Sequence, residues 1–305
     1  MAVKHPSSPT HYRNAGIPWW SPSKINAPLW YIVAEYTWRQ QLLWKYKRAS
    51  FKGDPAAEYK IQHLTKAGSI KMEAGTHVAD AAFRVLNGKI SPQEAHRHVI
   101  SQLQEHHPAT WNEADKTFTA HFLDEADGAV EATLEQTTAG LREVFIGANQ
   151  VEVEEKISLE LPGIDVPIIG YSDGRGAGTV IELKTKWDTR DKRSASGFKI
   201  NSLPKTPRSA DVLQVAVYQR QHGGRAVLLY ANRKDHRIFE IPQDDLDEAM
   251  DLALAICRKR QRILERTDGE LAQLIDIVEC DWSHYRLSDW SPDLRLHLKQ
   301  VFLND

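Results

Sequence analysis

The sequence predicts an α/β fold in which a central mixed sheet is flanked by helices. Helical periodicity occupies much of the first 130 residues, three strand-like runs follow between residues 148 and 187, and a helix then separates them from two further strands. This element order is typical of strands and helices that pack in layers. The 305 residues, 41% of them hydrophobic, suffice for one sizeable core with a helical accessory region, or for two small domains.

The N-terminal part is predicted to be an irregular arm followed by helices. Residues 1–26 are rich in Pro, Ser, His and Trp without a period, whereas residues 28–47 carry apolar and aromatic side chains at helical spacing. A second helix is expected over residues 75–86, where Asn87 and Gly88 provide a stop signal. Ser91 and Glu94 match a capping box, so a third helix should begin there.

Three strands are predicted in the middle of the chain. The runs at 148–161, 165–173 and 178–187 read as strands, and turns at 161–163 and 174–178 join them into a meander. Asp173 is thereby placed at the end of the second strand, where the chain turns at glycine. The remaining core elements are a helix at 209–221, strands at 225–231 and 237–241, and a helix at 243–266.

The element order divides the chain into three expected parts. Residues 1–130 would form the arm and a helical portion packed on the core, residues 131–266 the core itself, and residues 267–305 a C-terminal helical extension. The sequence contains neither an internal repeat nor a low-complexity tract.

Composition and charge narrow the class of protein. The formal net charge of -2 gives no overall support to nucleic-acid binding, so such support must be local. Two cysteines, Cys257 and Cys280, are too few for a disulfide framework and favour a reducing compartment. The N-terminus lacks the apolar stretch of a signal peptide, and no apolar run approaches the roughly 20 residues of a membrane span. We therefore expect a cytoplasmic protein without a membrane partner.

Three ionisable residues are candidates for a metal-dependent site. Glu182 and Lys184 lie two apart on one predicted strand and so project from the same face, next to Asp173. Carboxylates are hard ligands suited to Mg²⁺ or Mn²⁺, and a lysine beside such an ion can orient water or offset charge on a phosphate. An isolated Glu-x-Lys motif usually lies on the solvent-exposed face of an edge strand. Here the apolar residues on either side of Glu182 predict a central strand, where charges without partners would be costly.

A set of short motifs resembles the PD-(D/E)XK nucleases, and within them the RecB-type and lambda-exonuclease-like group. The motifs are Gly-Tyr-Ser-Asp, then Glu-Leu-Lys-Thr-Lys nine residues after the aspartate, and later Gln-Val-Ala-Val-Tyr. The resemblance implies a restriction-endonuclease-like core and metal binding by Asp173, Glu182 and the backbone carbonyl of Leu183. It also implies that Gln214 and Tyr218, which share a helix face, contact the lysine or DNA. The implied catalytic residues are Asp173, Glu182, Lys184, Gln214 and Tyr218.

Two parts of the family pattern fit less well. The resemblance implies a histidine as an additional metal ligand on a preceding helix, which maps to His77, but the family usually leaves more residues between this histidine and a glycine before it. Asp80, on the same predicted helix face, is the alternative ligand. Several members hold an iron–sulfur cluster through a Cys-Pro pair and three later cysteines, whereas this sequence has Ala27-Pro28 and only Cys280 in a comparable region. We therefore expect no iron–sulfur cluster.

A basic segment follows the predicted metal-binding strand. Between residues 184 and 208, eight basic residues stand against two acidic ones. A charge run is usually only a solvated surface, but its position beside the Glu-x-Lys strand favours contact with phosphates. Trp19 and Trp20, in the irregular arm, are expected to be exposed, where they could stack on bases. The expected DNA-binding residues are Lys186, Arg190, Lys192, Arg193, Lys199, Lys205 and Arg208.

The function implied is that of a metal-dependent DNA exonuclease. It would hydrolyse phosphodiester bonds from DNA ends in recombination, repair or phage DNA processing, in a bacterial or phage-infected cell. The alternatives are a structure- or sequence-selective DNA endonuclease on the same fold and a non-catalytic DNA-binding protein. Expected partners are DNA and, by analogy, a single-strand annealing protein or further copies of the chain.

Overall fold

The computed structural model describes part of the chain, and the described part forms two compact units. The helix predicted over residues 28–47 is described only from 29 to 33, and most of the predicted C-terminal extension, with Cys280, lies outside the described residues. The described residues are 8–33, 53, 70–105, 113–191, 193 and 198–277. The first unit comprises 1–67, 159–169 and 252–305, and the second comprises 68–158 and 170–251.

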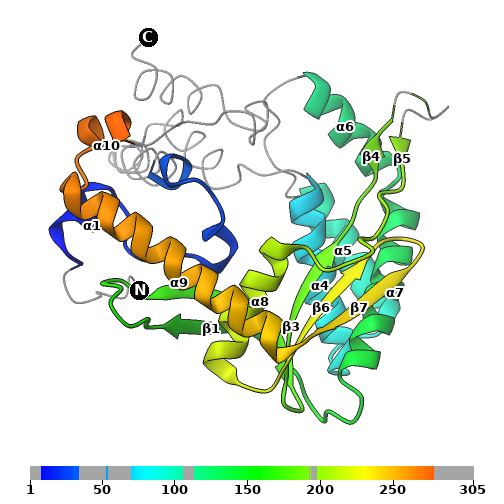
Figure 1. The fold of residues 1–305 in the computed structure, drawn as a ribbon. Coiled ribbons are helices and arrows are strands. Elements are labelled where there is room, and N and C mark those ends of the chain that lie inside the picture. The colour runs from blue at the N-terminus through cyan, green and yellow to red at the C-terminus, as the bar shows by residue number, and fades with distance from the viewer. Residues whose placement is uncertain are drawn as a thin grey trace. The chain divides into compact units, whose positions relative to one another are not determined.

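The second unit is built on a five-stranded mixed sheet, as the sequence predicts (Figure 1). Its first three strands form the predicted meander, β3 then pairs with β6 in parallel, and β6 pairs with β7 antiparallel. The strand order is β1 (Glu152–Leu159), β2 (Ile168–Gly176), β3 (Thr179–Thr185), β6 (Arg225–Ala231) and β7 (His236–Ile241). A separate pair, β4 (Thr189–Arg190) with β5 (Phe198–Lys199), forms within the basic segment, where no strand was predicted.

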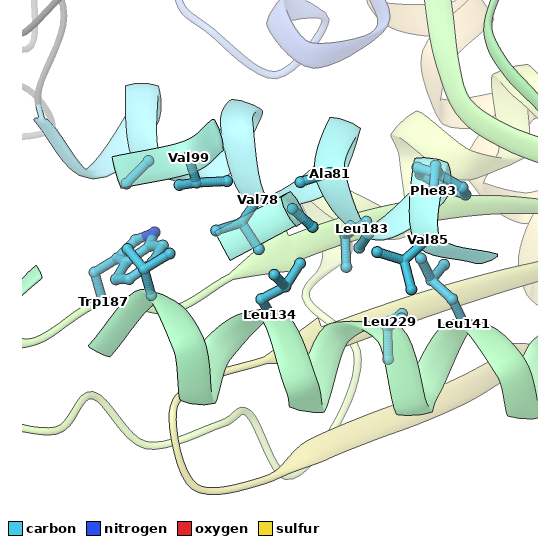
Figure 2. Packing of buried hydrophobic residues seen from close by; sticks show 14 of the residues in the cluster. Val78, Ala81, Phe83, Val85, Val99, Leu134, Leu141, Leu183, Trp187 and Leu229 are labelled. Carbon is cyan, nitrogen blue, oxygen red and sulfur yellow. The ribbon is translucent and has the colours of Figure 1, made fainter. Parts of the chain in front are cut away.

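Helices cover both faces of this sheet. One face packs against α4 (Ile70–Leu86) and α7 (Ala126–Val144), with α5 (Pro92–Glu105) packed on these two helices, and α8 (Ser209–His222) packs on β3 and β6. Figure 2 shows the core on the first face, where Val78, Leu134, Leu183 and Leu229 meet. The unit also contains α6 (Glu113–Asp124), and α9 (Gln243–Arg266) follows β7. None of the helices in the described ranges is long and apolar enough to cross a membrane.

Two glycines allow the helices to approach the sheet closely. A Cβ at Gly174 on β2 would lie 2.6 Å from the Phe83 ring of α4, and a Cβ at Gly140 on α7 would lie 2.6 Å from the Leu229 side chain of β6. Because side chains alternate along a strand, the packing of Gly174 toward α4 turns Asp173 to the opposite face. The glycine after the aspartate therefore helps to orient the candidate site.

The predicted capping box at the start of α5 is present. The Ser91 hydroxyl accepts the backbone N–H of Glu94 at 3.2 Å, and the Glu94 carboxylate accepts the backbone N–H of Ser91 at 2.8 Å. Replacing Ser91 by alanine is expected to lower the free energy of unfolding by about 1 kcal/mol, because one N-terminal N–H loses its acceptor. Urea unfolding measures this loss, and Ser101→Ala, inside the same helix, is the matched control. An equal loss in both variants would contradict the assignment.

The second strand is longer than the sequence predicts. It continues through Asp173 to Gly176, and the turn to β3 consists of Ala177 and Gly178, with φ angles of 45° and 70°. The prediction that Asp173 closes the strand is therefore wrong. Two glycines of the predicted turn, Gly174 and Gly176, instead pair with β3, opposite Ile181 and Thr179.

The first unit includes the described part of the N-terminal arm. The arm contains α1 (Thr10–Asn14) and a short 3-10 helix, η1 (Pro22–Lys24), and α10 (Leu271–Ile277) belongs to the same unit. Trp20 is only 1% exposed, so the expectation that it is an exposed stacking residue is wrong. Its backbone pairs with Pro167 and Ile169, and the Arg260 guanidinium lies 5.5 Å from its ring centroid. These contacts bury the Trp20 indole, although the sequence around it has no regular spacing of apolar residues.

Candidate active site

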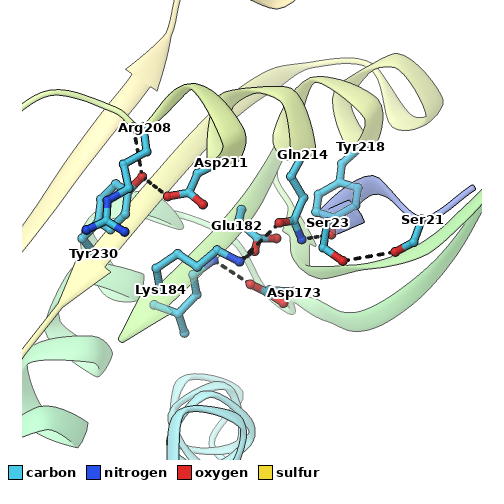
Figure 3. A network of polar contacts seen from close by, with 11 residues as sticks. Ser21, Ser23, Asp173, Glu182, Lys184, Arg208, Asp211, Gln214, Tyr218 and Tyr230 are labelled. Atoms are coloured by element: carbon cyan, nitrogen blue, oxygen red, sulfur yellow. Dashed lines mark hydrogen bonds and ion pairs between the residues drawn. The ribbon is translucent and has the colours of Figure 1, made fainter. Parts of the chain in front are cut away.

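The predicted carboxylates meet where β2 and β3 separate. The ladder between the two strands ends at the pair Gly174–Ile181, and beyond it the Asp173 carboxylate accepts the backbone N–H of Leu183 at 2.6 Å (Figure 3). A side chain thus takes the place of the missing main-chain partner. Burial raises the pKa of Asp173, against the lowering effect of this hydrogen bond, and the nearby Glu154 raises it further. Asp173 is held firmly beside β3.

Glu182 is a buried carboxylate that is only partly satisfied. The side chain is 2% exposed, and Oε1 contacts the ammonium of Lys184. Oε2 has no hydrogen-bond partner among the described residues. Burial and the neighbouring Asp173 raise the pKa of Glu182 to about 8. An orphaned oxygen at such a place is costly unless another group binds it.

Lys184 links the carboxylates to α8. Its side chain is 30% exposed, and burial opposes its charge, but the carboxylates of Glu182, Asp173 and Asp211 together raise its pKa. Lys184 is therefore a cation at neutral pH. Its ammonium also lies 3.3 Å from Oε1 of Gln214.

Gln214 and Tyr218 occupy one face of α8, as their spacing predicts. The Gln214 amide donates to the Tyr218 hydroxyl at 2.6 Å, so the amide oxygen faces Lys184. Burial raises the pKa of Tyr218, and the charge of Glu182 adds to that effect. The structure thus brings together all five residues that the motifs singled out for catalysis (Figure 3).

Two further residues belong to this network, although they are not part of the sequence motifs. Tyr230 lies beside Lys184 in the parallel pairing of β3 with β6, and its hydroxyl donates to the Asp211 carboxylate at 2.5 Å. The charge of Asp211 acts on both Glu182 and Lys184. A signal existed, because Asp211 stands three residues before Gln214 and seven before Tyr218, which places all three on one helix face.

The donor set fits a hard divalent cation. Asp173 and Glu182 supply carboxylate oxygens, and no described residue hydrogen-bonds to the second Glu182 oxygen. The N–H and C=O of one strand residue point to the same side, so the Leu183 carbonyl points toward Asp173, as its N–H does. Oxygen ligands of this kind suit Mg²⁺ or Mn²⁺. These residues therefore fit the ion that the sequence motifs imply.

His77 is not brought into this group. It lies on α4, which packs on the opposite face of the sheet through Phe83 and Gly174, and its Nε2 lies 3.9 Å from the Glu73 carboxylate. Among the described residues, no group of three ligand atoms includes His77 together with Asp173 and Glu182. Asp80, on the same helix, lies 3.6 Å from Arg84. The metal-ligand role of His77 stays a prediction without geometric support.

The basic residues are spread over several settings. Lys186 is half-buried, 5.4 Å from the Tyr230 ring centroid, and burial together with Arg208 lowers its pKa. Lys199 lies 3.1 Å from Asp191. The structure describes Arg193, Lys205 and Arg208 as exposed, does not describe the side chain of Arg190, and leaves Lys192 undescribed. Lys186 and Arg208 are the two that lie beside the carboxylate site.

The fold and the site define an α/β protein with two carboxylates and a lysine at the diverging ends of a strand pair. Comparison of the sequence with known families and with curated proteins finds no match. Among solved structures, the chain is similar to a "putative exonuclease" from Eubacterium rectale, with 13% identity and a TM-score of 0.36 over 67% of this chain and 69% of that chain. It is also similar to the protein SSO0001, with 19% identity and a TM-score of 0.25 over 45% of this chain and 68% of that chain. Similarity at this level carries no argument about function, which rests on the side chains of the site.

Proposed function

We propose that this chain is a metal-dependent deoxyribonuclease that hydrolyses phosphodiester bonds from DNA ends. The observation that carries the proposal is the buried Glu182 carboxylate, which has one oxygen without a partner in the described part of the chain and lies next to Asp173, in contact with Lys184. A buried carboxylate beside a half-buried one, with an adjoining ammonium, is costly as a purely structural feature. It is well suited to a site that is completed by a cation and a phosphate.

Each residue has a distinct part in the proposed reaction. A divalent ion held by Asp173, Glu182 and the Leu183 carbonyl would polarise the phosphate and lower the pKa of the attacking water. Lys184 offsets the negative charge that develops on the phosphate and orients the water, since its raised pKa keeps it protonated. Gln214 positions the ammonium of Lys184, and Tyr218 positions the Gln214 amide.

The basic residues beside the site support a polyanionic substrate. Lys186 follows the last residue of β3 and stands two residues after Lys184, about 6.5 Å further along an extended chain, which is the spacing of one strand face. Burial and the positive charge of Arg208 lower the pKa of Lys186, so the two cations repel each other. A bound phosphate between them would offset this repulsion. The preference for ends over internal sites rests on the resemblance of the sequence motifs to RecB-type exonucleases.

Matched linear and covalently closed circular duplexes test the proposal. Each is incubated with Mg²⁺, with Mn²⁺ and with chelator, alongside linear and circular single strands. Loss of the linear forms alone, only with metal, is the expected result. Cutting of circles would establish an endonuclease instead, and binding without cleavage under all conditions would establish a non-catalytic DNA-binding protein.

Replacing Lys184 by methionine is expected to lower the cleavage rate by about 10²–10³-fold, because the positive charge beside the phosphate is lost. Methionine keeps the length and apolar contacts of the lysine stem. Lys89→Met, an exposed lysine in the turn after α4, is the control and should leave the rate unchanged. Equal rates for Lys184→Met and the parent protein would remove Lys184 from the mechanism.

A further inference from the structure

An exposed tyrosine lies beside the proposed site. Tyr171 on β2 is 57% exposed, whereas its strand neighbours Ser172 and Ile169 are 0% and 7% exposed. It stands two residues before Asp173, so the two side chains project from the same face of the strand, about 6.5 Å apart. An exposed aromatic ring therefore adjoins the carboxylate pair.

Tyr171 also lies beyond the last paired residues of β2 and β3. The ladder ends at Gly174–Ile181, and extending its register places Tyr171 across from Lys184. On the other side of Lys184 stands Tyr230, in the register of β3 with β6. By register, Tyr171, Lys184 and Tyr230 form one row with the lysine in the middle, and β2 and β3 have separated where Tyr171 stands.

The two tyrosines of this row differ in what they can contact. Tyr230 is fully buried, its hydroxyl donates to Asp211, and Lys186 lies over its ring. Its ring faces are committed to the protein. Tyr171 is the aromatic residue of the row that presents its surface to solvent, next to a lysine that is itself 30% exposed.

A flat aromatic ring beside a phosphate-binding group is suited to a nucleobase. The base attached to a bound phosphate lies within several ångströms of it, and stacking on tyrosine is tolerant of sequence because every base has a π-face. In a duplex, the bases are stacked on one another and paired, so their faces are not open to a side chain. Away from the terminal base pair, only an unpaired nucleotide can use such a ring.

We propose that Tyr171 stacks on an unpaired nucleobase next to the scissile phosphate, so that the substrate is single-stranded DNA or an unpaired DNA end. This inference rests on the proposed function for the identity of the phosphate site. It adds the strand state of the DNA and a binding residue that the sequence motifs do not assign.

Equilibrium binding and cleavage test the proposal on three DNAs: a single strand, a blunt duplex and a duplex with a short unpaired end. Binding is measured in chelator by fluorescence anisotropy, and KM and kcat are measured with Mg²⁺ or Mn²⁺. Tyr171→Ala is expected to raise Kd and KM for the single strand and the unpaired end by about 5- to 100-fold, with little change in kcat. Tyr171→Phe keeps the ring and should retain the parent values.

Two controls make the result specific to stacking. Ile146→Ala removes another exposed hydrophobic side chain, 80% exposed and outside the site, and should change nothing. The second control is a series of DNA single strands that each lack one base, at a different position in each strand. At one position, the missing base should weaken binding to the parent protein and should not weaken binding to Tyr171→Ala any further. Unchanged single-strand affinity in Tyr171→Ala, or an equal loss on blunt duplex, would overturn the inference.

The failure of this inference is distinguishable from failure of the proposed function. If the parent cleaves no DNA with either metal, the proposed function fails, while the anisotropy measurements in chelator still decide whether Tyr171 binds bases. If the parent cleaves DNA and Tyr171→Ala behaves like the parent on all three DNAs, only the stacking inference fails.

Discussion

Glu182→Gln is expected to lower metal-dependent cleavage by at least about 10³-fold, on the order of 4 kcal/mol in the activation barrier. The substitution keeps the shape of the side chain and an oxygen that can face Lys184, but it removes the negative charge that a divalent ion needs. The lost charge should also weaken the binding of the metal ion to the protein before any DNA is cleaved. A thermal unfolding scan with and without Mn²⁺ should therefore show stabilisation of the parent and little or none of the variant.

A neutralised carboxylate elsewhere serves as the comparison. Glu248→Gln, on the exposed side of α9, removes the same charge far from any predicted ligand in the sequence and should retain both cleavage and stabilisation by Mn²⁺. Retention of parental cleavage by Glu182→Gln would exclude Glu182 as a metal ligand. Loss of cleavage with undiminished stabilisation by Mn²⁺ would place the ion on other residues.

The same substitution is expected to change how stability depends on pH in the absence of metal. The pKa of Glu182 is raised from 4.5 to about 8 in the folded protein, mainly by burial. Between these values the folded state holds the proton more tightly than the unfolded chain, so the free energy of unfolding falls as pH rises from 4.5 toward 8. The fall is at most about 1.4 kcal/mol per pH unit, and glutamine, which does not titrate, removes it.

Urea unfolding in chelator between pH 5 and pH 9 measures this effect. The difference in unfolding free energy between Glu182→Gln and the parent should shift in favour of the variant by a few kcal/mol as the pH rises. Any difference in packing or hydrogen bonding between glutamine and the protonated glutamate does not depend on pH, so the change with pH is the diagnostic quantity. A difference that is constant from pH 5 to pH 9 would show that Glu182 titrates normally.

Much of the fold follows from local sequence patterns. The strand at Arg225–Ala231 and the helix at Gln243–Arg266 have the predicted bounds, because a run of apolar residues and a 3.6-residue periodicity are visible without knowledge of any partner. The start of α5 was likewise predictable, since Ser91 and Glu94 form a reciprocal cap from adjacent residues. The sequence does not predict α6 and α7 as separate helices, because neither helix begins or ends with so clear a capping signal.

The candidate site is predictable to a similar extent. The two-residue spacing of Glu182 and Lys184 and the four-residue spacing of Gln214 and Tyr218 determine which side chains share a face. These spacings survive folding because the period of a strand or helix is a local property. They do not determine which faces meet.

The sequence by itself determined the element order, the mixed sheet and the identity of the paired acidic and basic side chains. Only the tertiary structure decided that Asp173 lies inside β2, where its carboxylate replaces a main-chain partner of Leu183. Packing also placed Phe83 of α4, the helix that carries His77, on the face opposite Asp173, and it brought Asp211 and Tyr230 to the lysine. The physical reason is that a partner for a buried polar group comes from a segment distant in sequence, and the pairing of strands and helices selects that segment.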